Sequence, residues 1–206
     1  MRNGDSTIST ENNDTAAPGW WLRGDEVALG PYVRRLVPVY WRWETDPRAL
    51  LGYGQQYPEA VETRDDVFTS QSRDGNPYFT IYDVTGERPV PIGMSNIIVD
   101  NRTRTGELVI LLGEEGRGRG LATEAIRLTL DYGFHITNLR NIYLSVLAPN
   151  TAGIRAYEKA GFALIGRRRN SGYWLGEVVD HVFMDAIPED FPGPSVLKPQ
   201  LGEPRP

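Results

Sequence analysis

The sequence predicts a mixed α/β domain (α+β class) organised around one βαβ unit in residues 106–162. An apolar run at residues 108–112 has the length of a buried strand, and a glycine-dense turn follows it at residues 113–120. A helical pattern continues from the turn, residues 141–147 form the next strand, and another helix opens at Asn150. Strand, glycine turn, helix and strand in this order indicate a βαβ unit.

Before this unit, short helical and strand patterns follow one another. Residues 26–29 fit a first strand, and residues 33–44 fit a short helix for which the pair Asp46-Pro47 is the stop. The sequence Thr63-Arg-Asp-Asp66 has the form of a capping box, which predicts a helix from there to about Ser72.

A β-hairpin leads into the βαβ unit. Residues 78–84 alternate between apolar and polar side chains, and the turn at residues 85–88 returns the chain into a second strand at residues 90–99. Residues 101–104 then form a tight turn before the first strand of the unit.

The glycine turn itself is suited to bind an anion. Gly118 and Gly120 lack a Cβ atom, so their backbone N–H groups can approach a ligand and φ can be positive. The first turn of the following helix leaves about four N–H groups without internal partners, and these donors favour a phosphate oxygen. Arg117 and Arg119 add cationic donors. On this motif alone, a tight turn without any ligand fits equally well.

Two other phosphate-binding motifs do not fit. A Walker A loop needs Gly-Lys-Ser/Thr, and the turn contains no lysine. A dinucleotide fingerprint needs a third glycine where this chain has Thr123, and an acidic residue at the end of the next strand, which here ends in residues 146–148, Val-Leu-Ala.

The end of the chain completes the domain. After Phe162 the sequence fits a strand to about Arg168, a loop at residues 170–172 and a last strand at residues 178–185. We expect a single domain at residues 19–190, between a polar disordered tail at residues 1–18 and a proline-rich tail at residues 191–206. Within the second tail, the apolar residues Phe191, Val196 and Leu197 are able to dock on the domain.

Composition limits the class of function. The chain has 206 residues, 40% of them hydrophobic, which suits one domain with tails. Its formal net charge is −5, which argues against a nucleic-acid partner and mildly favours a cationic substrate. There is no cysteine, and the only histidines are His135 and His181, so we expect no disulfide, no thiolate nucleophile and no metal site. No apolar run approaches the ~18 residues of a membrane span, and the start lacks an apolar signal region, so we expect a cytoplasmic protein without a membrane partner.

Two motifs at a fixed distance identify a family. Residues 117–122 read Arg-x-x-Gly-x-Ala, and residues 150–162 follow with Asn, six further residues, and Tyr-Glu-Lys-x-Gly-Phe. Together with the sequence Tyr-Gly-Phe at residues 132–134, they resemble the GNAT family of N-acetyltransferases. The resemblance covers roughly residues 22–190 and is closest to the Rim-type and spermidine acetyltransferase branch.

The resemblance implies a mostly antiparallel sheet flanked by helices, with one parallel pair of strands splayed around acetyl-CoA. It also implies that the pyrophosphate of the coenzyme binds at the glycine turn, and that backbone groups of the preceding strand pair with the pantetheine arm. The residues that we expect to bind the coenzyme are Ile110, Leu112, Arg117, Gly118, Arg119, Gly120, Leu121, Ala122, Asn150 and Arg155. For Asn150 an N-cap of the helix is an additional role, and for Arg155 exposure to solvent is an equal alternative.

Acetyl transfer needs a group that protonates the leaving thiolate, and Tyr157 is the candidate. It lies seven residues after Asn150, about two helical turns on, and the resemblance implies a position near the coenzyme sulfur. The alternative is a tyrosine that packs in the core.

Glu107 is the candidate general base, because relatives often carry an acid at this point of the motif strand. A Glu107 paired with Arg102 or Arg104 in the preceding turn is an equal alternative. A further alternative is that the amine loses its proton to water, without a dedicated base. Asp180 and His181 are weaker candidates for the base.

An aromatic cluster occupies the N-terminal part of the chain. It fits core packing of two helices, and because the resemblance places this region over the acceptor, it also fits a cleft wall that holds a cation. Its members are Trp20, Trp21, Tyr40, Trp41, Trp43, Tyr53 and Tyr57.

We therefore expect an acetyl-CoA-dependent N-acetyltransferase in which a primary amine attacks the thioester directly, within a ternary complex. The acceptor is a protein N-terminal amine, a polyamine, or an amine of an antibiotic or small metabolite. The alternatives are a GNAT-fold enzyme for another acyl-CoA or a carrier-protein thioester, and a sensor that binds acyl-CoA without turnover. A homodimer is left open.

Overall fold

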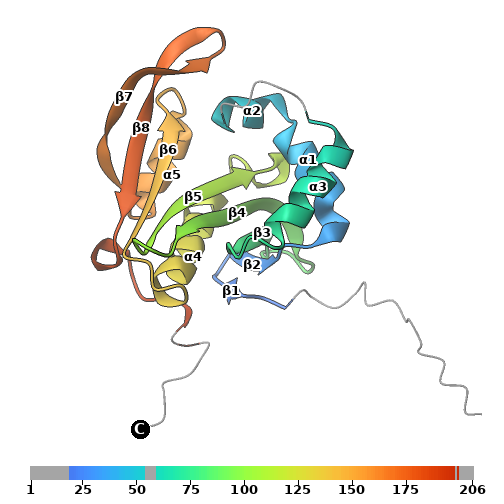
Figure 1. Cartoon of the computed structure of the whole chain (residues 1–206). Coiled ribbons are helices and arrows are strands. Elements are labelled where there is room, and N and C mark those ends of the chain that lie inside the picture. The colour runs from blue at the N-terminus through green and yellow to red at the C-terminus, as the bar shows by residue number, and fades with distance from the viewer. Residues whose placement is uncertain (1–18, 54–58, 198, 200–206) are drawn as a thin grey trace, which may run out of the picture.

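The computed structural model describes residues 19–53, 59–197 and 199, and these residues form one eight-stranded sheet with helices on both faces (Figure 1). The strands are β1 Leu22–Arg23, β2 Val27–Pro31, β3 Tyr78–Asp83, β4 Val90–Asp100, β5 Thr105–Leu112, β6 Asn141–Leu147, β7 Ala163–Trp174 and β8 Glu177–Ala186. The helices are α1 Val37–Glu44, α2 Pro47–Tyr53, α3 Val61–Gln71, α4 Leu121–His135 and α5 Thr151–Lys159, with short 3-10 helices η1 Arg34–Leu36, η2 Glu114–Gly116 and η3 Pro188–Asp190.

The topology confirms the predicted fold class. The strand order is β1-β2-β3-β4-β5-β6-β8-β7, and in the described residues every neighbouring pair is antiparallel except β5 and β6, which are parallel. Helix α4 connects the two parallel strands, so β5, α4 and β6 are the predicted βαβ unit.

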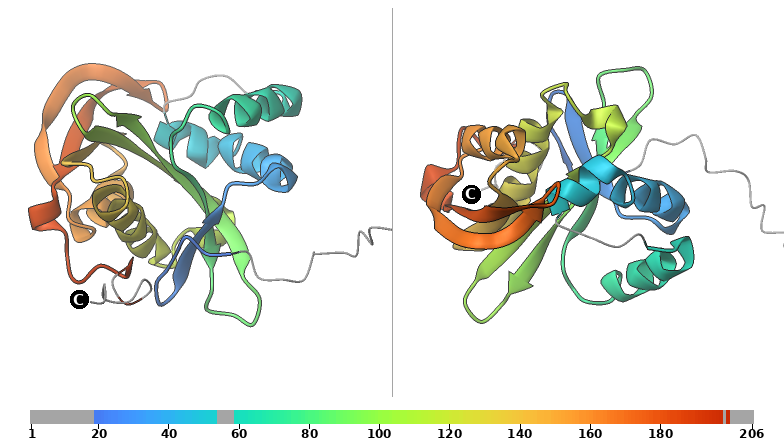
Figure 2. Two further views of the ribbon diagram at one scale, coloured as in Figure 1. Left: turned by 60° about the horizontal axis from the view of Figure 1, so that its bottom comes forward. Right: turned by 90° about the horizontal axis from the view of Figure 1, so that it is seen from above.

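Each face of the sheet has its own apolar core, and helices cover both (Figure 2). On one face, Ile126 and Leu130 of α4 pack against Leu108 of β5. On the other face, Trp43 of α1 packs with Leu111 of β5. Leu108 and Leu111 are three residues apart on a strand, where side chains alternate between faces, and this explains why β5 is buried from both sides.

Strands β5 and β6 separate after a short stretch of pairing. Their register pairs end at Glu107 and Tyr143, although β5 continues to Leu112 and β6 continues to Leu147. β5 stays paired with β4 over its whole length, whereas β6 continues with β8. The sheet therefore opens between β5 and β6, at the end of β5 where the glycine turn begins (Figure 1).

The residues of β5 that follow Glu107 turn alternate backbone groups toward this opening. The N–H of Gly113 donates to the carbonyl of Ile92 over 2.8 Å, which makes these two opposite residues a hydrogen-bonded pair. In an antiparallel ladder such pairs alternate with pairs that do not bond each other. Ile110 and Leu112 therefore direct their N–H and C=O groups away from β4, to the side that β6 has left.

Two predicted boundaries were wrong, and one helix was missed. The capping box at Thr63 does not start α3, because the helix begins at Val61 and its N-cap is Ala60, which has no side-chain cap. Thr63 thus lies inside the first turn of α3, and its side chain does not cap the helix.

The pair Asp46-Pro47 ends α1 as predicted, but it also begins another helix, α2, which the sequence analysis missed. Oδ1 of Asp46 accepts a hydrogen bond of 2.9 Å from the N–H of Arg48, and Pro47 occupies the first helical position. Proline is favoured there because its missing N–H would have no partner in the first turn.

The predicted loop at residues 170–172 is an irregularity inside β7, which runs on to Trp174. Ser171 stabilises it, since its hydroxyl donates to the carbonyl of Arg168 over 2.8 Å and accepts the N–H of His181. The chain turns instead at Leu175 and Gly176, which both have positive φ angles.

Residues 191–197, which begin the expected C-terminal tail, pack against the domain. Phe191 meets Phe134 edge to face, with ring centroids 6.1 Å apart, and Leu197 is buried in an apolar cluster with α4. The N–H of Val196 donates to Oδ2 of Asp131 over 2.8 Å. The expected tail at residues 1–18 lies outside the described residues.

Part of the aromatic cluster is core. Tyr40 and Trp43 are buried between α1, α3 and the sheet, whereas the side chain of Trp21 is 55% exposed. Tyr57 and the side chain of Tyr53 lie outside the described residues. In the part of the chain that the structure describes, no helix is long and apolar enough to cross a membrane.

Candidate active site

A cavity of about 360 Å³ lies at the opening between β5 and β6. Four elements line it: the end of β5, the glycine turn with the start of α4, helix α5, and helix α2. Its lining residues include Ile110, Leu112, Arg117, Gly118, Gly120, Ala122, Asn150 and Tyr157. Eight of the residues predicted from the two motifs are thus brought together around one space.

The glycine turn has the backbone geometry that the sequence predicted. Gly118 and Gly120 adopt φ angles of 72° and 82°, in the left-handed region that other residues rarely enter. Gly120 is the N-cap of α4 and provides no side chain to cap it. The N–H groups of the first turn of α4, beside Gly120 and Ala122, are therefore available to an anion in the cavity.

Both arginines of the turn are held by carboxylates from other elements. Arg117 forms an ion pair with Asp46 and donates from Nε to the carbonyl of Leu112 over 2.9 Å. Arg119 forms an ion pair of 2.6 Å with Asp83 and does not line the cavity. These contacts fix the turn against the α1–α2 junction on one side and β3 on the other.

The two carboxylates have lowered pKa values. Burial alone would raise the pKa of Asp46, but the N–H of Arg48 and the guanidinium of Arg117 outweigh it. At Asp83, the same burial effect is outweighed by Thr85 and Arg119, so its pKa is also lowered. Both groups are therefore ionised at neutral pH, and both ion pairs persist there.

Asn150 is the N-cap of α5, as predicted. Its Oδ1 accepts a hydrogen bond of 3.0 Å from the N–H of Gly153. The side chain also lines the cavity, so a structural and a ligand-binding role are compatible. Arg155, on the same helix, is exposed and does not line the cavity.

Tyr157 of α5 lines the cavity and packs against the apolar core between α4 and the sheet. The side chain is half-buried, and its ring meets Phe162 edge to face with centroids 5.8 Å apart. Burial raises the pKa of Tyr157 to about 12, so the hydroxyl keeps its proton at neutral pH. This is the state that a proton donor needs.

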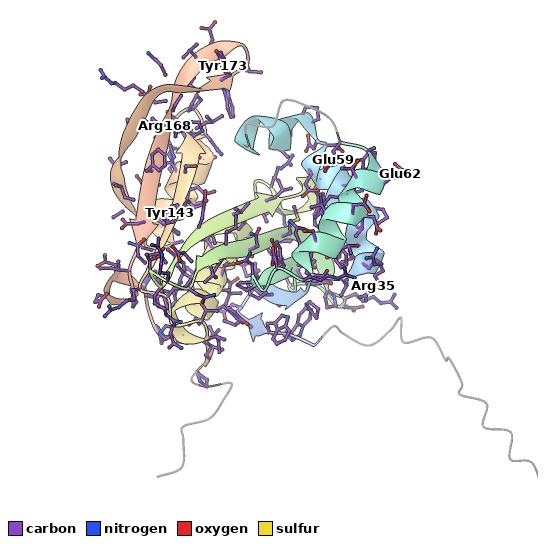
Figure 3. The ribbon with its side chains drawn as sticks, in the orientation of Figure 1. Arg35, Glu59, Glu62, Tyr143, Arg168 and Tyr173 are labelled. Carbon is purple, nitrogen blue, oxygen red and sulfur yellow. The ribbon has the colours of Figure 1, made fainter. Side chains whose placement is uncertain are left out.

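Glu107 lies outside the cavity lining, at the point where β5 and β6 separate. It shares a face of β5 with Leu111, and this is the face that α1 covers. On the neighbouring strand, Tyr143 lies on the β6 side of the same opening (Figure 3). Glu107 is thus on the α1 side of the sheet, whereas Leu108, next to it on the chain, faces α4.

The alternative that pairs Glu107 with the preceding turn is not what the structure shows. Arg104 donates to the carbonyls of Thr137 and Asn138, and Arg102 lies 3.9 Å from Asp100. Leu121, another predicted site residue, is buried in the core beneath the turn, so only its backbone can reach a ligand.

The weaker candidates for the base lie on β8, away from the cavity lining. His181 contacts the hydroxyl of Ser171 through Nδ1 at 2.8 Å, and Asp180 accepts the N–H of Asn170. Burial, and then the charge of Arg168, lower the pKa of His181. Its hydrogen bond to the irregularity in β7 explains its place without any catalytic role.

Sequence reasoning missed the contribution of α2. Arg48, Ala49 and Gly52 line the cavity across from α5, and a Cβ atom at Gly52 would lie 3.9 Å from Nδ2 of Asn150. The only local signal was the pair Asp46-Pro47, which fits the start of a helix as well as its end.

The geometry agrees with a known family. The family model described as an acetyltransferase (GNAT) domain matches residues 27–163, which is more than half of the chain. The chain belongs to the GNAT family. It is therefore an acetyltransferase, as the two motifs predicted.

Several relatives and solved structures are similar to this GNAT protein. Spermidine N(1)-acetyltransferase of Escherichia coli K12 is 28% identical over 180 residues, which cover 84% of this chain and 95% of the relative. The crystal structure of spermidine N-acetyltransferase from Vibrio cholerae in complex with CoA and spermine matches with a TM-score of 0.74 at 22% identity, over 80% of this chain and 97% of that one. A GNAT acetyltransferase from Bacillus anthracis matches with a TM-score of 0.69 at 18% identity, over 82% and 98% of the two chains.

The spermidine acetyltransferase half of the expected branch is thus represented among the relatives of this GNAT protein. The Rim-type half stays a prediction.

Proposed function

We propose that this GNAT protein transfers the acetyl group of acetyl-CoA to a primary amine of a small molecule, with polyamines as the first acceptor class. One observation carries the proposal: the glycine turn and the protonated Tyr157 line the same cavity, between two strands that have separated. An anion-binding turn and a proton donor are the two groups that a bound thioester with a diphosphate needs.

The backbone of β5 supports the donor. Beyond the last paired residue, Glu107, the backbone N–H and C=O groups of Ile110 and Leu112 point to the side that β6 has left. There the carbonyl of Leu112 accepts a hydrogen bond from Arg117. The amide groups of a pantetheine arm would pair with the remaining groups as an added strand does. With the arm paired in this way, we expect the thioester to lie along β5 and the diphosphate to bind at Gly118 to Ala122.

The chemistry then needs one bond to form and one to break. The amine nitrogen attacks the thioester carbon, the new C–N bond forms, and the C–S bond breaks. Tyr157 gives its proton to the leaving thiolate, and backbone N–H groups of β5 stabilise the charge on the carbonyl oxygen. The proton that the amine loses goes to Glu107 or to water.

Polyamines are favoured as acceptors because both the relative from E. coli and the structure from V. cholerae carry the name of spermidine acetyltransferases. The formal net charge of −5 is compatible with a polycation. Peptides with a free N-terminus are a second acceptor class to be tested, because the resemblance to the Rim-type branch predicts acetylation of protein N-terminal amines.

A thiol-release assay with acetyl-CoA tests the proposal. The panel contains spermidine and spermine, aminoglycosides, and peptides with a free N-terminus, and mass spectrometry identifies the acetylated product. We expect thiol release with a polyamine and loss of most of it in Tyr157→Phe. Replacing acetyl-CoA by longer acyl-CoA esters separates the proposed donor from other thioesters. Binding of acetyl-CoA without thiol release for any amine would contradict the proposal and favour a sensor.

A further inference from the structure

Asp46 connects two walls of the coenzyme cavity through its two carboxylate oxygens. Oδ1 accepts the N–H of Arg48 and so begins α2, which lines one wall. Oδ2 accepts from Nη1 of Arg117 in the glycine turn, which lines another wall. The two residues are 71 positions apart in the chain, so this contact exists only in the folded protein.

The guanidinium of Arg117 is held at two of its three nitrogens. Nε donates to the carbonyl of Leu112 over 2.9 Å, and Nη1 donates to Asp46. Nη2 is enclosed and has no hydrogen-bond partner among the described residues. The two bonds tie Arg117 to the end of β5 and to Asp46 at the start of α2, so they fix the position of the glycine turn.

Arg119 offers a contrast within the same turn. Its ion pair with Asp83 leaves the side chain 45% exposed, and it does not line the cavity. Arg117 is 26% exposed, lines the cavity, and keeps an enclosed donor free. Of the two arginines in the turn, Arg117 is therefore the one that lines the cavity and ties the turn to β5 and to the start of α2.

We propose that Asp46 is a positioning residue for coenzyme binding, which holds Arg117 so that the backbone N–H groups of the glycine turn stay directed at an oxygen of the diphosphate. This inference rests on the proposed use of acetyl-CoA. A planar guanidinium suits the role, because its fixed fork can bind the carbonyl of Leu112 and the carboxylate of Asp46 at the same time. Asp46 adds no contact to the ligand itself.

The variant Asp46→Asn separates this role from others. Asparagine keeps an oxygen that can cap α2, but it loses the charge that holds Arg117. The change also removes one negative charge from the protein, which by itself would favour an anionic ligand. A weaker affinity therefore cannot come from net charge.

Titration calorimetry with CoA gives the decisive measurement. For Asp46→Asn we expect CoA to bind about tenfold more weakly, because the N–H groups of the turn are no longer fixed toward the diphosphate. 3′-Dephospho-CoA, which retains the diphosphate, should lose the same factor. In the acetyl-transfer assay, KM for acetyl-CoA should rise while kcat at saturation stays within about twofold of the parent, because the contact is equal in ground and transition states.

Matched variants complete the experiment. Asp65→Asn, which removes a carboxylate from the exposed pair with Arg34, should leave CoA affinity unchanged. Arg117→Gln should weaken CoA binding like Asp46→Asn, and the double variant should be no weaker than the weaker single one, because both act through one contact. If Asp46→Asn fails to fold, Arg117→Lys takes its place, since lysine keeps the charge but lacks the planar fork that binds Asp46 and the carbonyl of Leu112 together.

Equal CoA affinity in Asp46→Asn and Asp65→Asn would overturn the inference, as would parental affinity in Arg117→Gln and Arg117→Lys. CoA binding by the parent without acetyl transfer would contradict the proposed function and leave these comparisons intact. A parent that does not bind CoA would contradict both.

Discussion

Glu107 of β5 lies directly opposite Tyr143 of β6, in the pair after which the two strands separate. The two residues mark the inner end of the opening between β5 and β6, which leads to the cavity lined by the glycine turn and Tyr157. Burial is the main reason why the pKa of Tyr143 is raised, and the charges of Glu107 and Asp100 raise it further. Glu107 thus brings negative charge to the α1 side of the sheet, outside the coenzyme cavity.

Glu107→Gln tests whether this carboxylate handles the amine. We expect kcat/KM for the amine to fall by at least about tenfold, as for the loss of a general base. CoA affinity should stay unchanged, because Glu107 does not line the cavity. Steady-state kinetics and calorimetry check the two parts, with Glu87→Gln in an exposed turn as the control. If Glu107→Gln keeps full activity, the amine loses its proton to water.

Tyr157→Phe tests the proton donor. We expect kcat to fall about tenfold or more, because the thiolate leaves without a proton, while CoA affinity stays nearly unchanged. In the parent enzyme, a Tyr157 pKa of about 12 means that the donor is protonated below that pH and is lost only above it. The pH profile of kcat should therefore show no loss from Tyr157 between neutral and mildly alkaline pH. A fully active Tyr157→Phe would make Tyr157 a packing residue.

The parts of the site that the sequence predicted depend on local signals. The glycines with positive φ, the N-cap Asn150 and the apolar spacing of α4 are each set by residues within a few positions of one another. Such patterns can be predicted from sequence because backbone conformation and helix periodicity are determined over short stretches of the chain. Tyr157 follows from the same logic, since it lies two turns along the helix that Asn150 opens.

The parts that the sequence did not predict depend on tertiary contacts. The ion pairs of Arg117 with Asp46 and Arg119 with Asp83 join elements whose distance in space no local pattern encodes. The length of β7 was missed because Asn170 and Ser171 are typical of loops, and the hydrogen bonds of Ser171 that keep them in a strand come from the fold. The place of α2 over the cavity belongs to the same class.

Gly120→Ala tests the geometry of the glycine turn. A Cβ atom at Gly120 would meet nothing within 4 Å, so steric clash is not the issue. The substitution is instead unfavourable because of the φ angle of 82°, at which an L-residue is strained by about 1–2 kcal/mol. The backbone should relax and turn the first N–H groups of α4 away, and we expect CoA to bind about tenfold more weakly by calorimetry.

Gly166→Ala is the control for this variant, since Gly166 has equally open space without a positive φ. Its CoA affinity should match that of the parent. Equal affinities in the two alanine variants would mean that the anion does not bind at the start of α4.

Arg64→Met tests what holds the helices over the α1 face of the sheet. Arg64 of α3 is only 1% exposed, and it donates to the carboxylate of Glu44 in α1 and to the hydroxyl of Tyr32. Removing it leaves the partly buried carboxylate of Glu44, which is 22% exposed, without its partner, so we expect the free energy of unfolding to fall by about 3 kcal/mol. Arg34→Met, which breaks the exposed pair with Asp65, should cost at most about 1 kcal/mol by the same urea titration. Because the loss comes from the unpaired charge of Glu44, the double variant Arg64→Met/Glu44→Leu should regain part of the lost stability. A double variant less stable than Arg64→Met would show that packing, and not charge, determines the loss.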